Sequence, residues 1–241
     1  MKCSRIILFL LVTLLVFGLC EQSAQAYPVS IAEAVDNTDL RWYYYGAESW
    51  FGQTTTSYYG GDAAQSGDIG HNQVSVVYTY VTGPGTLSFV WSVSSEANPN
   101  TGAVYDDLHF IIDGTSMARI GGEVSWQYRS FHISSGYHKL SWLYEKSPSD
   151  DYPVGYDAGW LDMVRYSSLT VTAPNGGEKW IRGTTHTITW TSTGLSGVPL
   201  TIELMKGGVL NKVIVSATAN DGSHSWTISS TQKLGTDYKI R

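Results

Sequence analysis

The acidic side chains at the ends of expected strands are the first residues whose types could do chemistry. They are Glu96, Asp106, Asp107, Asp157 and Asp162. Carboxylate oxygens are the ligands that Ca²⁺ prefers, in sets of about six to eight. Two carboxyls could hydrolyse a glycosidic bond if they flanked it at one of two separations. The simpler interpretation is solvated loop acids, because no Asp-x-Asp-x-Asp spacing occurs. The sequence predicts no obligatory cofactor; the exception to consider is a structural calcium ion bound by Glu96, Asp106, Asp107 and Asp162.

Aromatic side chains are the second group that could act. The chain has 9 tryptophans and 16 tyrosines, and a flat ring can stack on a sugar ring while a polar rim bonds the hydroxyls. Tyr44 is expected to point away from Tyr43 and Tyr45, because alternate residues of a strand face opposite sides. Packing inside a core is the alternative role for the same rings. The candidate ligand-binding residues are Tyr44, Trp50, Trp126, Tyr156 and Trp160.

No recognised catalytic motif accompanies these residues. The six histidines are scattered, with no His-Glu-x-x-His and no cysteine pair outside the first 26 residues, so a zinc site is not expected. His109 alternates with apolar residues and is most simply a surface residue. No Gly-x-Ser-x-Gly nucleophile elbow occurs. We therefore expect a protein that is not an enzyme.

Residues 1–26 have the pattern of a secretory signal peptide. Lys2 and Arg5 precede an apolar run, and Ala24-Gln25-Ala26 fits the cleavage rule. Both cysteines, Cys3 and Cys20, lie in this segment, so the mature chain would be exported without a disulfide, which suits a prokaryote. The expected location is outside the cell or at its surface, with no membrane insertion after signal removal.

The net charge limits the classes of partner that the chain is expected to bind. Removing Lys2, Arg5 and Glu21 with the signal segment changes the net charge from −6 to −7. Without a basic stripe, an acidic chain is not expected to bind nucleic acid.

The elements that must position these side chains are short strands. In Gly85 to Glu96, Leu87, Phe89, Trp91 and Val93 share one parity, which predicts a half-buried strand after Gly83-Pro84-Gly85. Asp113-Gly114 predicts a tight hairpin, and Ser135-Gly136 predicts another turn. Seven or eight strands at spacings of about ten residues indicate a β-sandwich.

A second unit begins where Ser and Thr become frequent. We expect an all-β protein in which residues 27–167 form one β-sandwich and 168–241 form a small immunoglobulin-like sandwich. Such a fold usually takes about 100 residues and seven strands. The chain ends within an expected strand, so a closing strand is expected to be missing and the sequence to be a fragment.

Two resemblances follow from these motifs. Ser49-Trp50-Phe51-Gly52-Gln53, Gly83-Pro84-Gly85-Thr86-Leu87-Ser88-Phe89 and Asp157-Ala158-Gly159-Trp160-Leu161-Asp162 resemble a prokaryotic extracellular module of the concanavalin A-like and MAM-like jelly-roll type. Val171 to Trp180 and Asn220 to Trp226 are similar to the N-terminal domain of the yeast cell-wall synthesis proteins, the Ser/Thr-rich GPI-anchored family. The resemblances imply a jelly-roll accessory domain and a cell-wall or surface context.

The function expected from the sequence is a secreted, non-catalytic module that binds an extracellular glycan or a cell-surface protein. The alternative is a structural spacer or protein-interaction segment of a larger surface protein or secreted hydrolase.

Overall fold

The computed structural model describes residues 29–149, 152 and 155–241. The expected signal peptide lies outside these residues. Within them the chain is all-β, as predicted, with one short helix, α1 (Ile31–Ala34), that begins at the capping box of Ser30 and Glu33. No helix among the described residues has the length and apolar character needed to cross a membrane.

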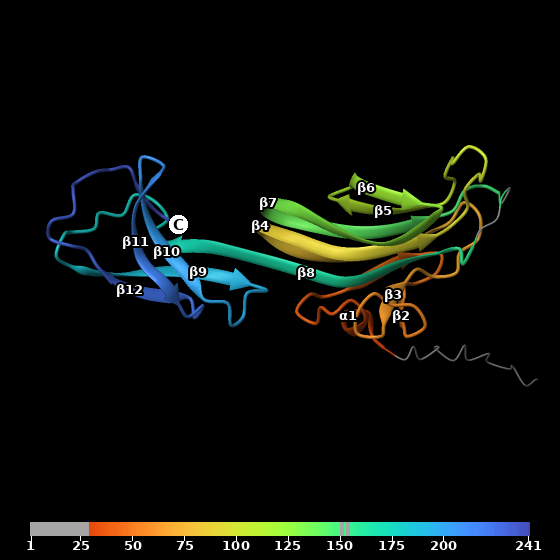
Figure 1. Cartoon of the computed structure of the whole chain (residues 1–241), viewed down its shortest axis with the longest axis horizontal. Helices are drawn as coiled ribbons and strands as arrows, with labels where there is room; N and C mark the ends of the chain where they lie inside the picture. Colours follow the sequence, from red (N-terminus) through yellow and green to blue (C-terminus); the bar gives the residue numbers. More distant parts are fainter. Residues whose placement is uncertain (1–28, 150–151, 153–154) are drawn as a thin grey trace, which may run out of the picture.

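Ten of the described strands join in one extended sheet. Seven follow the order β12-β9-β8-β4-β7-β5-β6, and β1, β2 and β3 pair at its side. Their bounds are β1 (Tyr43–Gly46), β2 (Phe51–Gln53), β3 (Ala63–Gln65), β4 (Val74–Ser94), β5 (Asp107–Ile112), β6 (Thr115–Gly121), β7 (Glu123–Glu145), β8 (Ala158–Ala173), β9 (Thr185–Thr193) and β12 (Ser223–Thr227). In Figure 1, α1, β2 and β3 lie below the long strands β4 and β8, and β5 and β6 lie above β7.

Strands β4 and β7 are longer than the sequence predicted. Gly83-Pro84-Gly85 does not begin a new strand and Ser135-Gly136 does not reverse the chain, because Gly83 pairs with Gly136 within one continuous ladder. The two backbones approach closely there: a Cβ on Gly83 would lie 1.8 Å from the carbonyl oxygen of Ser134. Glycine therefore lets the ladder continue through a register shift between Gly83 and Gly85.

The first core confirms the predicted inward parity of the strand after Gly85, but the prediction that this strand is half-buried is wrong, because Val90, Ser92 and Ser94 of the other parity are buried as well. Leu87, Phe89 and Trp91 are fully buried and Val93 is 1% exposed. Phe89 lies at the centre, with its ring centroid 5.0 Å from that of Phe110 and 5.2 Å from that of Trp142. The hairpin expected at Asp113-Gly114 is also confirmed, since both residues have positive φ between β5 and β6.

The second unit has its own core. It contains a separate three-stranded sheet and the β8-β9-β12 end of the large sheet. The order of the small sheet is β11 (Val209–Thr218), β10 (Leu200–Lys206), β13 (Tyr238–Ile240). A separate cluster of buried side chains belongs to this unit: Ile188, Trp190, Ile202, Leu204, Trp226 and Ile228. Strand β8 pairs with β4 through its first part and with β9 through its last, so one strand runs through both units (Figure 1).

Candidate functional site

A cluster of tyrosines occupies the face of the large sheet opposite the first core. Strand register puts it there: Tyr43 of β1 pairs with Tyr78 of β4, and Tyr80 of β4 pairs with Lys139 of β7. Directly paired residues share a face of the sheet. We call this cluster the tyrosine face: Tyr43, Tyr45, Tyr78, Tyr80, Tyr137 and Lys139.

The opposite parity of the same strands explains why these rings point outward. Val77 and Val81 alternate with Tyr78 and Tyr80 in β4, and both valines are packed in the first core. A strand that buries one parity presents the other to solvent. The exposed fractions are 40% for Tyr43, 49% for Tyr45, 37% for Tyr80 and 69% for Tyr137.

Ring contacts make the tyrosine face continuous. Tyr80 is its centre: the ring stacks on Tyr137 with centroids 5.1 Å apart and planes 10° apart, and meets Tyr78 edge-on at 5.7 Å. Tyr43 stacks on Tyr78 at 5.3 Å. Each ring is held by its neighbours, so a ligand would meet a largely ordered surface and little side-chain entropy would be lost on binding.

Lys139 places a positive charge within these rings. Its Nζ lies 4.0 Å from the ring centroid of Tyr78 and 4.9 Å from that of Tyr45, which is cation-π geometry. Among the described residues no carboxylate pairs with this ammonium group. The tyrosine face thus combines apolar ring area, phenolic hydroxyls and one positive charge.

The sequence analysis did not find this surface. It selected Tyr44, which alternates with Tyr43 and Tyr45 and therefore faces the opposite side of the sheet. Tyr44 pairs with Val77 and is 56% exposed at the sheet edge. The available signal was the repeated i, i+2 spacing of Tyr43 with Tyr45 and of Tyr78 with Tyr80. That spacing shows a shared face within each strand, but not that β1 pairs with β4.

The predicted aromatic residues do not form one surface. Trp50 is 2% exposed and donates its indole N–H to the carbonyl oxygen of Ser75 at 3.0 Å. Trp160 is 5% exposed and donates to Gln65 Oε1 at 3.0 Å. Both rings are used in packing, which was the alternative role considered for them.

The remaining predicted rings lie apart from the tyrosine face. Trp126 is half-buried, with its centroid 6.2 Å from that of Tyr58. Tyr156 is 84% exposed and meets the buried Trp160 edge-on at 6.2 Å. Of the five predicted rings, only Tyr156 and Trp160 are in ring contact with each other among the described residues.

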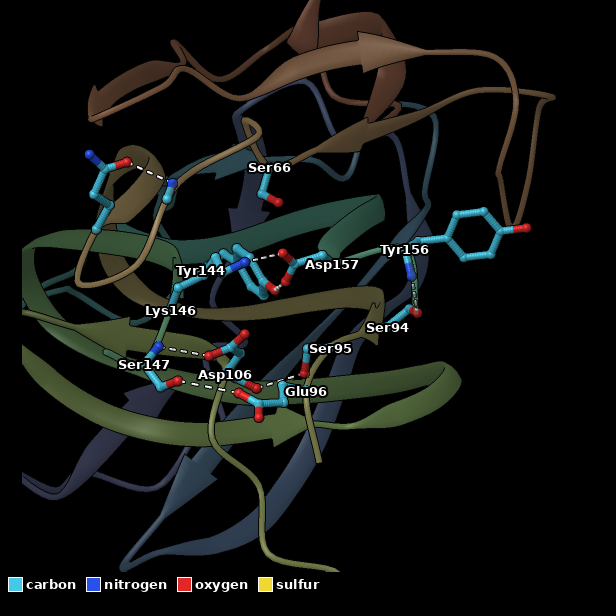
Figure 2. A network of polar contacts seen from close by, with 12 residues as sticks. Ser66, Ser94, Ser95, Glu96, Asp106, Tyr144, Lys146, Ser147, Tyr156 and Asp157 are labelled. Carbon is cyan, nitrogen blue, oxygen red and sulfur yellow. Dashed lines mark hydrogen bonds and ion pairs between the residues drawn. The ribbon is translucent and has the colours of Figure 1, made fainter. Parts of the chain in front are cut away.

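Three of the predicted acidic residues, Glu96, Asp106 and Asp157, belong to a polar network (Figure 2). Glu96 is 1% exposed and accepts the backbone N–H of Tyr152 at 2.8 Å. Asp106 is fully buried and accepts the backbone N–H of Ser147 at 2.7 Å. Figure 2 shows both carboxylates directed toward the segment that begins at Ser147. Their contacts therefore connect the strand ends with the loop after β7.

Lys146 supplies the positive charge of this network. Its ammonium group pairs with Asp157, and the Asp157 carboxylate also accepts the Tyr144 hydroxyl at 2.6 Å. Only 5% of the Lys146 side chain is exposed. A lysine ammonium therefore occupies the place beside Asp157 where a cation would be needed.

The four proposed calcium ligands have different surroundings in the structure. Asp162 accepts the backbone N–H groups of Tyr58 and Tyr59, at 2.8 and 2.9 Å. Asp107 lies beside Arg119, whose guanidinium is 3.3 Å from its carboxylate. Glu96, Asp106, Asp107 and Asp162 form no shared cluster of ligand atoms among the described residues.

Burial changes the acidity of two of these groups. Loss of hydration raises the pKa of Asp106 above its ordinary value, against the opposing hydrogen bond from Ser147. Burial likewise raises the pKa of Asp162, although backbone N–H groups donate to its carboxylate. Since each carboxylate is held by backbone donors at a loop, we interpret both as groups that fix loop conformation.

Comparison with known families identifies the C-terminal part. Residues 173–241 match the Kre9/KNH-like N-terminal Ig-like domain, which confirms the resemblance inferred for the second unit. The match covers residues of β9 to β13 and begins at the last residue of β8. No curated protein matches the chain. The jelly-roll assignment of the first unit stays a prediction.

Similar solved structures include a secreted protease, an adhesin domain and modules of a glycoside hydrolase. The secreted serine protease VesC from Vibrio cholerae is 15% identical with a TM-score of 0.43, over 58% of this chain and 27% of that one. The K1 adhesin domain of Lys-gingipain from Porphyromonas gingivalis is 14% identical with a TM-score of 0.38, over 53% and 90%. Tandem CBM51 modules of a Streptococcus pneumoniae family 98 glycoside hydrolase are 12% identical with a TM-score of 0.29, over 76% and 83%. The chain thus spans about a quarter of the VesC chain, and these likenesses assign neither a fold family nor a function.

Proposed function

We propose that the protein is a secreted, non-catalytic module that binds an extracellular glycan on its tyrosine face. The observation that carries this proposal is the group of ordered tyrosine rings around Tyr80, exposed on one sheet face and in contact with one another. Aromatic rings on an ordered scaffold can stack on the apolar face of a sugar, while phenolic hydroxyls bond its polar rim. The signal-peptide pattern of residues 1–26 and the match of residues 173–241 to the Kre9/KNH-like Ig-like domain support an extracellular setting.

The shape of the surface favours a chain-like ligand. The rings are carried by three neighbouring strands of one sheet, β1, β4 and β7. A sheet face offers width and length but little enclosure, whereas sites for small molecules are usually concave. An oligosaccharide that contacts several rings at once would gain about 0.5–1.5 kcal/mol from each stacking contact. We therefore expect weak binding of single sugars and stronger binding of longer glycans.

The Ig-like unit has a different role in this proposal. Because β8 is continuous from the first unit into the second, the two are joined by a strand. We propose that the second unit is a structural spacer and that the first unit carries the binding face.

A protein partner is the second candidate for the same face. Tyrosine is enriched in protein interfaces, where it combines apolar area with a hydroxyl group. The ammonium group of Lys139, which pairs with no carboxylate among the described residues, would then meet an acidic group of the partner. This alternative keeps the tyrosine face as the binding surface and changes only the chemistry of the ligand.

A glycan array tests the proposal directly. The untagged chain, labelled at its N-terminal amine, is applied to an array of bacterial, fungal and plant oligosaccharides of graded length. Retention that increases with oligosaccharide length and is reduced in Tyr80→Ala would support it. A folded chain, verified by circular dichroism, that retains no glycan at high micromolar concentration would contradict it and leave the protein-partner alternative.

A further inference from the structure

The geometry points to a metal site with a different ligand set from the calcium site considered above: we propose that Asp107, His109 and Glu145 bind one first-row divalent cation of the Zn²⁺ class. One possible ligand atom from each of these residues lies within 4.8 Å of the other two. The proposal is independent of the glycan proposed above, because it rests on different residues.

Strand register brings the three side chains together. Asp107 of β5 pairs directly with Glu145 of β7, and His109 follows two residues later in β5 on the same face. Direct pairing of two carboxylates is unfavourable in a sheet, because like charges repel at this separation. A divalent cation between them would convert that repulsion into attraction.

The imidazole of His109 is oriented for this role. Its Nδ1 lies 3.2 Å from Ser116 Oγ, and its Nε2 is 3.1 Å from Glu145 Oε1 and 3.8 Å from Asp107 Oδ2. The Nε2 atom is shielded from solvent and makes no hydrogen bond among the described residues. A proton on Nδ1, donated to Ser116, would leave the Nε2 lone pair directed at the two carboxylates, and such a bond to the far nitrogen is the usual support of a metal-bound histidine.

The surroundings leave room for solvent ligands. The Asp107 side chain is 9% exposed and that of His109 15%, while that of Glu145 is 46% exposed. Two ligands are thus fixed in the sheet and the third lies at the solvent boundary. One imidazole nitrogen with two carboxylate oxygens suits Zn²⁺, with water completing its coordination, whereas Ca²⁺ needs a larger set of oxygens.

Arg119 competes for the site. Its guanidinium is 3.3 Å from Asp107 Oδ2, and the Arg119 side chain is 65% exposed, although that of Asp107 is only 9% exposed. Because the guanidinium lies on the exposed side of the pair, it can turn into solvent when a metal ion binds Asp107. Replacing Arg119 should therefore strengthen metal binding, whereas replacing any of the three ligands should weaken it.

Calorimetric titration of the untagged, chelator-treated chain with ZnCl₂ tests the site. We expect one Zn²⁺ per chain, and at least tenfold weaker binding in both His109→Gln and Glu145→Gln. His132→Gln is the matched control, because His132 is an exposed histidine on β7 outside the triad. It should bind like the wild type. Loss of the Ser116 hydroxyl in Ser116→Ala should weaken binding by about 10–100-fold, the range for supporting partners of metal-bound histidines.

Contrary results would overturn the assignment. Absence of saturable one-to-one binding would refute the site, as would equal binding by wild type, His109→Gln and Glu145→Gln. Tighter binding of CaCl₂ than of ZnCl₂ would refute the class of cation. Binding that is unchanged or weaker in Arg119→Gln would refute the assignment of Asp107 as a ligand. Circular dichroism of each variant shows that the fold is intact, and Glu145→Gln, at the solvent boundary, is the variant least exposed to folding effects.

Discussion

Two buried tryptophans of the first core allow the packing to be tested by one chemical change made twice. Trp50 and Trp91 are 2% and 0% exposed. The indole N–H of Trp50 donates to the carbonyl oxygen of Ser75, whereas that of Trp91 has no acceptor among the described residues. Replacing each by phenylalanine removes the same atoms from the same core. The two variants therefore differ mainly in whether the indole N–H that is removed had a hydrogen-bond acceptor.

The magnitudes follow from that difference. In Trp50→Phe a hydrogen bond worth about 0.5–1.5 kcal/mol is lost in addition to the packing cost, while in Trp91→Phe a buried donor that costs about 1–3 kcal/mol is removed. The packing costs are similar and largely cancel in the comparison. We expect Trp91→Phe to be more stable than Trp50→Phe by about 1.5–4.5 kcal/mol. Trp91→Ala, which empties the whole site, should lose about 3–5 kcal/mol.

Native-state hydrogen exchange measured by mass spectrometry is the suitable assay. The chain has two separate cores, so a single unfolding midpoint would mix them. Peptides from Leu140 to Tyr144 report on the first core, and peptides from β10 report on the second and serve as the internal control. Equal destabilisation by Trp50→Phe and Trp91→Phe would refute the proposed difference, and a loss below about 1 kcal/mol in Trp91→Ala would refute the central role of this strand.

Three further predictions concern charged groups. Asp113→Asn should lower the pKa of His138, measured by NMR, because the Asp113 carboxylate raises that pKa through a hydrogen bond; an unchanged pKa would contradict the contact. Lys146→Met should cost about 3–5 kcal/mol in hydrogen exchange, because it leaves a partly buried partner carboxylate unpaired; a neutral effect would contradict the network. Burial raises the pKa of Asp106, so the folded state binds a proton more tightly than the unfolded state does. The free energy of unfolding of the wild type, relative to that of Asp106→Asn, should therefore rise as the pH falls from 7 toward about 4. A fall in that difference on acidification would contradict the direction of the shift.

Local patterns predicted much of the first core. The period of two from Leu87 to Val93 is a property of one strand, and the turn at Asp113-Gly114 needs only two residues, so both were available from the sequence. The continuity of β4 and β7 was not, because glycine usually interrupts a strand. Here Gly83 is needed for a close approach to Ser134 on a partner strand distant in the sequence.

The candidate sites depend on pairing between distant strands. The tyrosine face forms because β1 and β7 both pair with β4, and no spacing within one strand reveals that arrangement. Likewise, His109 and Glu145 meet only because β5 pairs with β7, so the absence of a metal-binding motif did not exclude the cluster. The indole rings of Trp50 and Trp160 were candidates by type, and only their burial shows that they pack inside.

A comparison of two tyrosine variants tests the central claim most directly. Tyr80 is the centre of the tyrosine face, while Tyr156 is a highly exposed tyrosine that lies elsewhere. With the best glycan from the array, calorimetry of the chain should show about three- to tenfold weaker binding in Tyr80→Ala, since one stacking contact contributes about 0.5–1.5 kcal/mol. Tyr156→Ala should bind like the wild type. Loss of binding in Tyr156→Ala with full binding retained in Tyr80→Ala would contradict the claim and move the site to the other surface.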